Sequence, residues 1–340
     1  AIACVLLYLA IVKKFEPLLL LPIAFGMLLS NLPMIKDSSA IMMHTEFFTN
    51  PEYMTDGKYI NVGYICQHGG LLDLLYLGVK LGIYPPLIFV GIGCMTDFGP
   101  LIANPKSILL GAAAQFGVFF TFVGALVLSA LVPSINFGIK EAASIGIIGG
   151  ADGPTAIYVT KSLAPALLPA IAVAAYSYMA LIPVIQPPIM KLMTRKKDRM
   201  IVMEQLRPVS KTEKILFPII VTIIVALIIP DAVSLVGCLM LGNLMKESGV
   251  VERLTKMAQN ELMNIITLFL GVTVGATATA SSFLSAQTIG IIVLGLIAFC
   301  FSTVGGLFLG DIMCWVTKGK VNPLIGSAGV SAVPMAARVS

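Results

Sequence analysis

Long, uninterrupted apolar runs dominate this sequence and limit what it can fold into. The clearest are residues 107–133, 162–188, 214–230 and 283–304. A membrane-spanning helix needs about 20 apolar residues, and these runs are continuous rather than alternating, which excludes an outer-membrane barrel. Of the 340 residues 58% are hydrophobic and only 11% are charged, whereas about a quarter of a soluble domain is charged. The sequence therefore predicts an all-α, polytopic membrane protein with room for about ten to twelve spans.

The excess positive charge is concentrated in one loop. Residues 191–214 contain eight basic and three acidic side chains, an excess equal to the net charge of +5 for the whole chain. The positive-inside rule predicts that this loop is cytoplasmic in a multi-pass protein of the cell membrane. The loop separates a first membrane half, residues 1–190, from a second, residues 215–340. It lacks interleaved aromatic residues, so nucleic acid is not expected as a partner.

Cysteine and histidine usage disfavours a transition-metal centre. The six cysteines are scattered, no CxxC pair occurs, and the chain has only two histidines, so a zinc or haem site is not expected. The chain starts inside an apolar run and stops two residues after Arg338. We therefore expect further spans beyond both ends.

The most unusual segment is GIIGGADGPT, residues 146–155, which places Asp152 in an apolar setting. An ionised carboxylate at the centre of a bilayer costs about 2.5–3.5 kcal/mol. The neighbouring glycines and Pro154 predict a break in the helix, which frees backbone carbonyl groups beside the acid. Such an oxygen-rich site suits a sodium ion or a proton. The structural alternative is a kinked helix in which Asp152 caps the second half.

A second interrupted segment lies near the end of the sequence. NPLIGSAGVSAVPMAAR, residues 322–338, shares with residues 148–161 an Ile-Gly pair, a following alanine and a terminal cation. Paired interrupted segments predict an inverted-repeat transporter with its site near the membrane midplane. Small-residue packing motifs alone are the alternative explanation.

Polar side chains on these segments are candidates for the site. The amide oxygen of Asn322 would coordinate sodium or cap the helix that starts at the next residue. The Ser331 hydroxyl is either an ion ligand or a helix-packing group. Arg338 and Lys161 either bind a carboxylate or extend to the membrane interface.

Two tyrosines follow the Asp152 segment. The phenol of Tyr178 is a candidate ion ligand or proton relay, and Tyr176 is equally well explained as an interfacial tyrosine. In the second half, residues 245–264 are amphipathic at helical spacing, which predicts a segment that lies on a membrane surface or packs on a neighbour.

Five motifs together resemble the β subunit of the sodium-pumping, biotin-dependent decarboxylases, which act on oxaloacetate, methylmalonyl-CoA or glutaconyl-CoA. The motifs cover most of the chain and are FEPLLLLPIAFG (15–26), GGLLDLLYLGVKLGIYPPLIFVGIG (69–93), MTDFGPLIANPKSILLGAAAQFG (95–117), GIIGGADGPTAIYVT (146–160) and residues 322–338. By this resemblance the functional residues of the family fall on Asp152, Tyr178, Asn322, Gly326, Ser331 and Arg338.

The resemblance implies a function and partners. Such a subunit decarboxylates carboxybiotin carried by another chain, consumes a proton and exports sodium. Its expected partners are a biotin-carrying protein, a carboxyltransferase and a small membrane subunit, and a homo-oligomer with an elevator-like fold is expected. The implied sodium ligands are Asp152, Tyr178, Asn322, Gly326 and Ser331, the implied catalytic residues are Asp152, Tyr178, Ser331 and Arg338, and Arg338 or Lys161 would hold carboxybiotin. The alternatives are a sodium-coupled secondary carboxylate transporter that catalyses no reaction and a non-catalytic membrane anchor for a larger complex.

Overall fold

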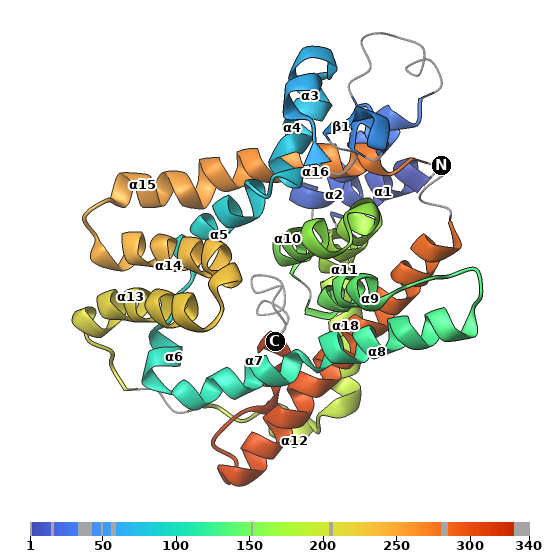
Figure 1. Ribbon diagram of the computed structural model, residues 1–340. Helices are drawn as coiled ribbons and strands as arrows, with labels where there is room; N and C mark the ends of the chain where they lie inside the picture. The colour runs from blue at the N-terminus through green and yellow to red at the C-terminus, as the bar shows by residue number, and fades with distance from the viewer. Residues whose placement is uncertain are drawn as a thin grey trace.

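The computed structural model describes residues 2–14, 17–32, 43–48, 50–55, 59–150, 152–203, 207–279 and 285–329, and these are mostly helical (Figure 1). The only strands within these ranges are β1, Met54–Thr55, and β2, Tyr59–Ile60, which pair antiparallel. The predicted all-α fold is confirmed.

The helices before the basic loop are mostly short. They are α1 (Ile2–Ile11), α2 (Pro17–Ser30), η2 (Thr45–Phe48), η3 (Pro51–Tyr53), α3 (Val62–His68), α4 (Leu71–Lys80), α5 (Tyr84–Met95), α6 (Gly99–Ala103), η4 (Pro105–Ser107), α7 (Ile108–Ala114), α8 (Phe116–Leu131), α9 (Ile139–Gly146), η5 (Ile147–Gly150), α10 (Gly153–Leu163), η6 (Pro165–Leu167) and α11 (Leu168–Met193).

The basic loop contains α12 (Lys196–Arg199), and both long and short helical elements follow it. They are α13 (Lys211–Ile228), η7 (Pro230–Ala232), α14 (Val233–Ser248), α15 (Glu252–Met257), the π-helix η8 (Ala258–Leu262), α16 (Met263–Thr277), α18 (Ala286–Val316) and the 3-10 segment η9 (Pro323–Gly329).

Three helical stretches of the described chain are long and apolar enough to cross a membrane alone: Pro105–Leu131, Glu252–Thr277 and Ala286–Val316. The pair α4 and α5 passes the same test together but is bent by 70°. The bend follows from Gly82, whose φ of +75° lies in the left-handed region that glycine adopts without a steric penalty. The predicted spans 107–133 and 283–304 correspond to the first and third stretches.

The amphipathic segment 245–264 is divided between two helical stretches. Gly249, at φ +70°, ends α14 in the left-handed conformation that commonly terminates a helix. A new helical stretch begins at Glu252 and continues through η8 into α16. Lys246 and Glu247 therefore end α14, whereas the charged residues from Glu252 onwards occupy the first turns of a long apolar stretch.

Glycines bring two helix pairs into backbone contact. A Cβ atom on Gly275 of α16 would lie 2.0 Å from the carbonyl oxygen of Ile23 in α2. A Cβ atom on Gly242 of α14 would lie 2.0 Å from the carbonyl oxygen of Val90 in α5. Close approach through small residues is the usual way membrane helices associate, because lipid provides no hydrophobic driving force.

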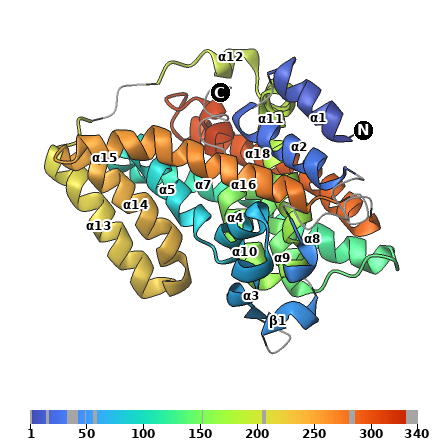
Figure 2. The same ribbon diagram turned by 90° about the horizontal axis from the view of Figure 1, so that it is seen from above.

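The helices form two groups, which Figure 1 separates clearly. We call α5, α13, α14 and α15 the α14 group, and α8, α9, α10, α11 and α18 the α11 group. Figure 2 shows α15 and α16 as one long rod that extends from the α14 group across the molecule. A direct polar contact between the groups joins the hydroxyls of Tyr158 in α10 and Ser234 in α14, 2.6 Å apart.

Helix α11 lies between two hydrophobic cores. Tyr176 packs in a core that includes Ile23 of α2 and Leu270 of α16. Tyr178 packs in a second core with Ile148 and Ile291. Neighbouring positions on α11 therefore face different parts of the molecule.

Candidate functional site

The helix is interrupted between η5 and α10, and Asp152 lies at the interruption. Asp152 is extended, at φ −120° and ψ 97°, and is the N-cap of α10. Its Oδ1 accepts a hydrogen bond from the Thr155 backbone N–H at 3.2 Å, and its Oδ2 accepts one from the Thr155 hydroxyl at 2.5 Å. The predicted helix break is confirmed, and the capping contact offered as the structural alternative is present.

The residues around Asp152 explain why the chain breaks there. Pro154 occupies the first turn of α10, where its missing N–H costs nothing. Gly149 lies against α8, because a Cβ atom at this position would be 2.5 Å from the Gly117 carbonyl oxygen. The break is therefore held by close backbone packing before Asp152 and by a good helix start after it.

The second interrupted segment, η9, starts directly after Asn322. The Asn322 Oδ1 accepts from the Leu324 N–H at 3.0 Å. Its Nδ2 donates to the carbonyl oxygens of Arg199 and Ile201 at 3.1 and 3.0 Å. Asn322 thus connects the basic loop to η9.

Gly326 of η9 is packed in the same way as Gly149. A Cβ atom on Gly326 would lie 1.9 Å from the carbonyl oxygen of Gly306 in α18. The predicted repeat aligns Gly149 with Gly326, and each glycine lies against a glycine carbonyl of a long apolar helix. The similar packing of the two glycines agrees with an internal repeat. That the two repeats are inverted relative to each other stays a prediction.

Helix α11 reaches towards both interrupted segments. The ring of Tyr176 lies against Gly153, the residue after Asp152, since a Cβ atom there would come within 2.7 Å of the ring. The Tyr178 hydroxyl faces α18 and donates to the Ile292 carbonyl oxygen. Gln186, further along α11, donates to the Ser327 carbonyl oxygen of η9 at 2.8 Å.

Of the remaining predicted site residues the structure describes Lys161. Lys161 donates from Nζ to the Leu81 carbonyl oxygen at 3.0 Å and lies 5.1 Å from the centre of the Tyr158 ring. Lys161 therefore provides a hydrogen-bond donor to a carbonyl group at the C-terminal end of α4. Ser331 and Arg338 lie outside the residues that the structure describes.

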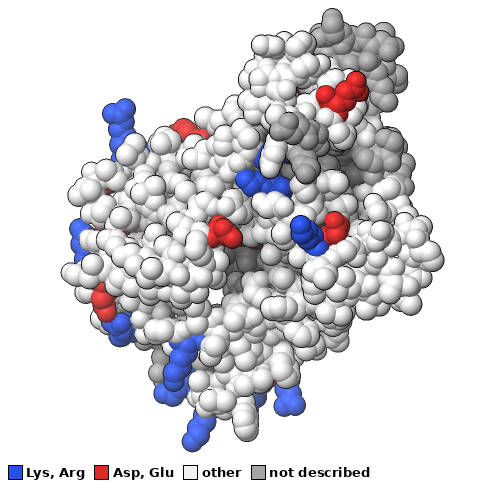
Figure 3. Space-filling model, in the orientation of Figure 1, with Lys and Arg blue, Asp and Glu red and all other residues white. Residues whose placement is uncertain are grey.

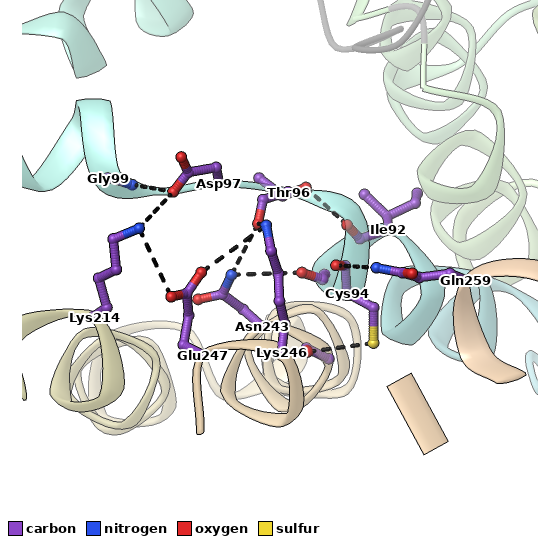
Figure 4. Close-up of polar contacts among 12 residues, drawn as sticks. Ile92, Cys94, Thr96, Asp97, Gly99, Lys214, Asn243, Lys246, Glu247 and Gln259 are labelled. Carbon is purple, nitrogen blue, oxygen red and sulfur yellow. Dashed lines mark hydrogen bonds and ion pairs between the residues drawn. The ribbon is translucent and has the colours of Figure 1, made fainter. Parts of the chain in front are cut away.

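A polar cluster that the sequence did not indicate surrounds the C-terminal end of α5 (Figure 4). The Thr96 carbonyl oxygen accepts from Asn243 and Lys246 of α14, both at 3.0 Å. Gln259 of η8 donates to the Cys94 carbonyl oxygen at 2.6 Å. Carbonyl groups at this helix end thus accept hydrogen bonds from side chains of α14 and η8.

The start of α13 contributes a lysine to this cluster. Lys214 lies 3.4 Å from Asp97 and 3.8 Å from Glu247 (Figure 4). One turn earlier a capping box begins α13, in which Ser210 and Glu213 exchange hydrogen bonds. The Arg207 side chain, together with the Ser210 N–H and hydroxyl, lowers the pKa of Glu213 to about 2. The same box sets the direction of α13 and so the position of Lys214.

Another acid, Asp73, has a structural role. It is fully buried at the start of α4. Its Oδ1 accepts from the His44 backbone N–H at 2.7 Å, and its Oδ2 lies 2.6 Å from His44 Nδ1 and 2.9 Å from the Gly70 nitrogen. These contacts satisfy Asp73, and they attach the segment around His44 to the helical core.

The basic residues on the visible surface lie mostly near the basic loop. In Figure 3 the visible face is largely uncharged, and Lys and Arg gather along its lower edge, in the region of α12 and the loop after it. This arrangement leaves the apolar helices free to contact lipid.

Comparison with known proteins identifies the family. The whole chain, residues 1–340, matches the family described as Na+-transporting oxaloacetate decarboxylase beta subunit. It is 59% identical to the methylmalonyl-CoA decarboxylase subunit beta of Propionigenium modestum, over 100% of this chain and 83% of that protein. It is 55% identical to the glutaconyl-CoA decarboxylase subunit beta of Acidaminococcus fermentans, over 100% and 81%. It is 51% identical to the oxaloacetate decarboxylase beta chain of Klebsiella pneumoniae, over 100% and 84%. The chain therefore belongs to the family of sodium-transporting decarboxylase beta subunits.

Proposed function

We propose that this subunit decarboxylates carboxybiotin presented by a partner chain and couples the reaction to sodium export across the cell membrane. The proposal rests on the family and on one observation: Asp152 lies at a break between two helices of a membrane protein. Intramembrane acids usually mark ion or proton pathways. The names of the relatives favour a decarboxylase over the alternative of a secondary carboxylate transporter.

Asp152 has the capacity to bind sodium while it caps α10. A carboxylate has about four acceptor positions, and Thr155 occupies two of them. The N–H groups at the N-terminal end of α10 carry partial positive charge and attract the carboxylate when it is ionised. Sodium and a proton would then compete for the same carboxylate.

The other proposed ligands retain acceptor capacity. The Tyr178 oxygen donates its proton to Ile292 and keeps its lone pairs. The Asn322 Oδ1 accepts one hydrogen bond of the two it can accept. Gly326 and Ser331 complete the ligand set that the family resemblance implies.

Decarboxylation requires a held carboxylate and a proton. The N–CO2 bond of carboxybiotin breaks, CO2 leaves, and the electron pair remains on the ureido nitrogen, which takes up a proton. Arg338 is the proposed carboxylate ligand, since its planar guanidinium binds both oxygens. Lys161 would have to leave the Leu81 carbonyl oxygen to take the same role.

The complete assembly is also part of the proposal. A biotin-carrying protein, a carboxyltransferase and a small membrane subunit are the proposed partners, and the β subunit forms a homo-oligomer. The biotin-carrying protein approaches the loop 191–214 on the cytoplasmic side. This loop divides the chain into the membrane halves 1–190 and 215–340.

The purified complex tests this function directly. We expect decarboxylation that depends on sodium and is abolished by avidin, which sequesters biotin. Asp152→Asn should lower the sodium-dependent rate at least about 100-fold, as expected when a group essential to the reaction is lost. The matched control is Asp231→Asn, in the short helix η7, which should keep the wild-type rate. Decarboxylation that needs neither sodium nor biotin would contradict the proposal.

A further inference from the structure

Helix α11 contains a fully buried amide, Gln186, that faces η9. Its Nε2 donates to the Ser327 carbonyl oxygen at 2.8 Å, and both residues are completely buried. The Gln186 Oε1 is also buried, and it has no hydrogen-bond donor in the part of the chain that the structure describes. Because buried polar atoms are almost always paired, this oxygen needs a partner that is not a described side chain or backbone group.

The hydrogen bond to Ser327 determines which way the amide points. A flipped amide would place Oε1 against the Ser327 carbonyl oxygen, and two acceptors repel each other. The Ser327 hydroxyl gives its proton to the Leu324 carbonyl oxygen at 2.6 Å. Gln186 therefore presents an acceptor oxygen beside η9, at Ser327.

We infer that the Gln186 Oε1 is a ligand of the transported sodium ion at η9, an inference that rests on the proposed function. An amide oxygen is a hard, neutral ligand of the kind that hard cations prefer. A neutral ligand leaves no buried charge behind when the ion departs, which suits a site that must fill and empty in every cycle. Gln186 follows Tyr178 by eight residues on α11, so one helix would supply ligands to both parts of the ion pathway.

Two substitutions separate a ligand from a structural contact. Gln186→Met removes both the oxygen and the bond to Ser327. Gln186→Glu keeps an oxygen at the same position, and when ionised it also loses the bond to Ser327. The control is Gln259→Met, because Gln259 makes the same kind of bond, to the Cys94 carbonyl oxygen, at the end of α5.

The readouts are the sodium concentration for half-maximal decarboxylation by the intact complex and the sodium-induced rise in its unfolding temperature. We expect Gln186→Met to raise the half-saturating sodium concentration about 10-fold and to reduce the thermal shift. At pH 8 the half-saturating sodium concentration of Gln186→Glu should equal that of wild type or lie below it. The half-saturating sodium concentration of Gln259→Met should stay within about two-fold of wild type, because this variant leaves the ligand set intact.

The inference is overturned if Gln186→Met titrates like wild type, or if Gln186→Glu is as insensitive to sodium as Gln186→Met, because the bond to Ser327 would then be the cause. If Gln186→Met does not assemble, Gln186→Glu decides alone: a half-saturating concentration more than about two-fold above wild type contradicts a ligand role. A wild-type complex without sodium dependence would instead overturn the proposed function.

Discussion

Asp152 combines a structural contact with the proposed coupling role. It caps α10 through two hydrogen bonds from Thr155. Asparagine caps a helix about as well as aspartate. Asp152→Asn therefore removes charge and proton binding while it preserves the start of α10, which makes it a test of coupling rather than of folding.

Tyr178→Phe tests the second proposed ligand at the residue scale. It removes the bond to the Ile292 carbonyl oxygen, a loss of about 0.5–1.5 kcal/mol in stability. If the phenol also binds sodium, the half-saturating sodium concentration should rise several-fold in steady-state decarboxylation assays. Tyr84→Phe is the control, because Tyr84 donates to the Leu75 carbonyl oxygen at 2.9 Å within the α4–α5 bend. Equal shifts in both variants would show that Tyr178 acts only through stability.

The sequence predicted some of these residues for clear physical reasons. A carboxylate among glycines and a proline indicated the break at Asp152. Gln186 could not be found in the same way, because an amide in an apolar run has many explanations until its partner on a distant segment is known. The contact between Tyr176 and Gly153 likewise depends on how α11 packs against α10.

At the scale of elements, glycine contacts determine which helices pair. Gly242 and Gly237 lie on the same helix, α14, in different surroundings. A Cβ atom on Gly242 would clash with the Val90 carbonyl oxygen, whereas one on Gly237 would have neighbours no closer than 3.8 Å. The first position therefore excludes a methyl group and the second accepts it.

Gly242→Ala should destabilise the protein by about 1–3 kcal/mol, the usual cost of overpacking. Gly237→Ala should be neutral or stabilise it by up to about 1 kcal/mol, because alanine favours helix. Unfolding in mild detergent, followed by loss of helical circular dichroism, measures both. Equal stability of the two variants would show that the α5–α14 contact is not tight.

Element boundaries were predicted less well than element types. The apolar runs indicated the long spans, but hydropathy did not distinguish the amphipathic end of α14 from the start of α15. The signal was Gly249, whose left-handed conformation ends α14. The short interrupted segments η5 and η9 were predicted as breaks, but their packing on α8 and α18 depends on contacts far apart in the sequence.

At the scale of the molecule, the two helix groups are candidates for bodies that move relative to each other. The α14 group is joined internally by Gly242 and by the cluster around Thr96. The α11 group contains Asp152 and α11. The hydroxyls of Tyr158 and Ser234 meet where the groups touch. An elevator-like cycle, which the family resemblance implies, would break this contact.

Cross-linking tests that motion. In a background without the exposed cysteines Cys4 and Cys66, a short thiol cross-link between Tyr158→Cys and Ser234→Cys should stop sodium transport, and cleavage should restore it. The control joins Thr222→Cys to Gly237→Cys inside the α14 group, where a Cβ atom on Gly237 would lie 3.9 Å from Thr222. This control should remain active. Full transport by the first cross-linked protein would mean that these groups do not separate.

Sodium titration of the decarboxylation rate at several pH values, on the intact wild-type complex, tests the central claim most directly. A carboxylate must be ionised to hold sodium, and protonation removes the ion. The apparent affinity for sodium should therefore weaken steadily as the pH falls, while saturating sodium restores the rate. A sodium affinity that does not change with pH would contradict competition between sodium and protons at Asp152.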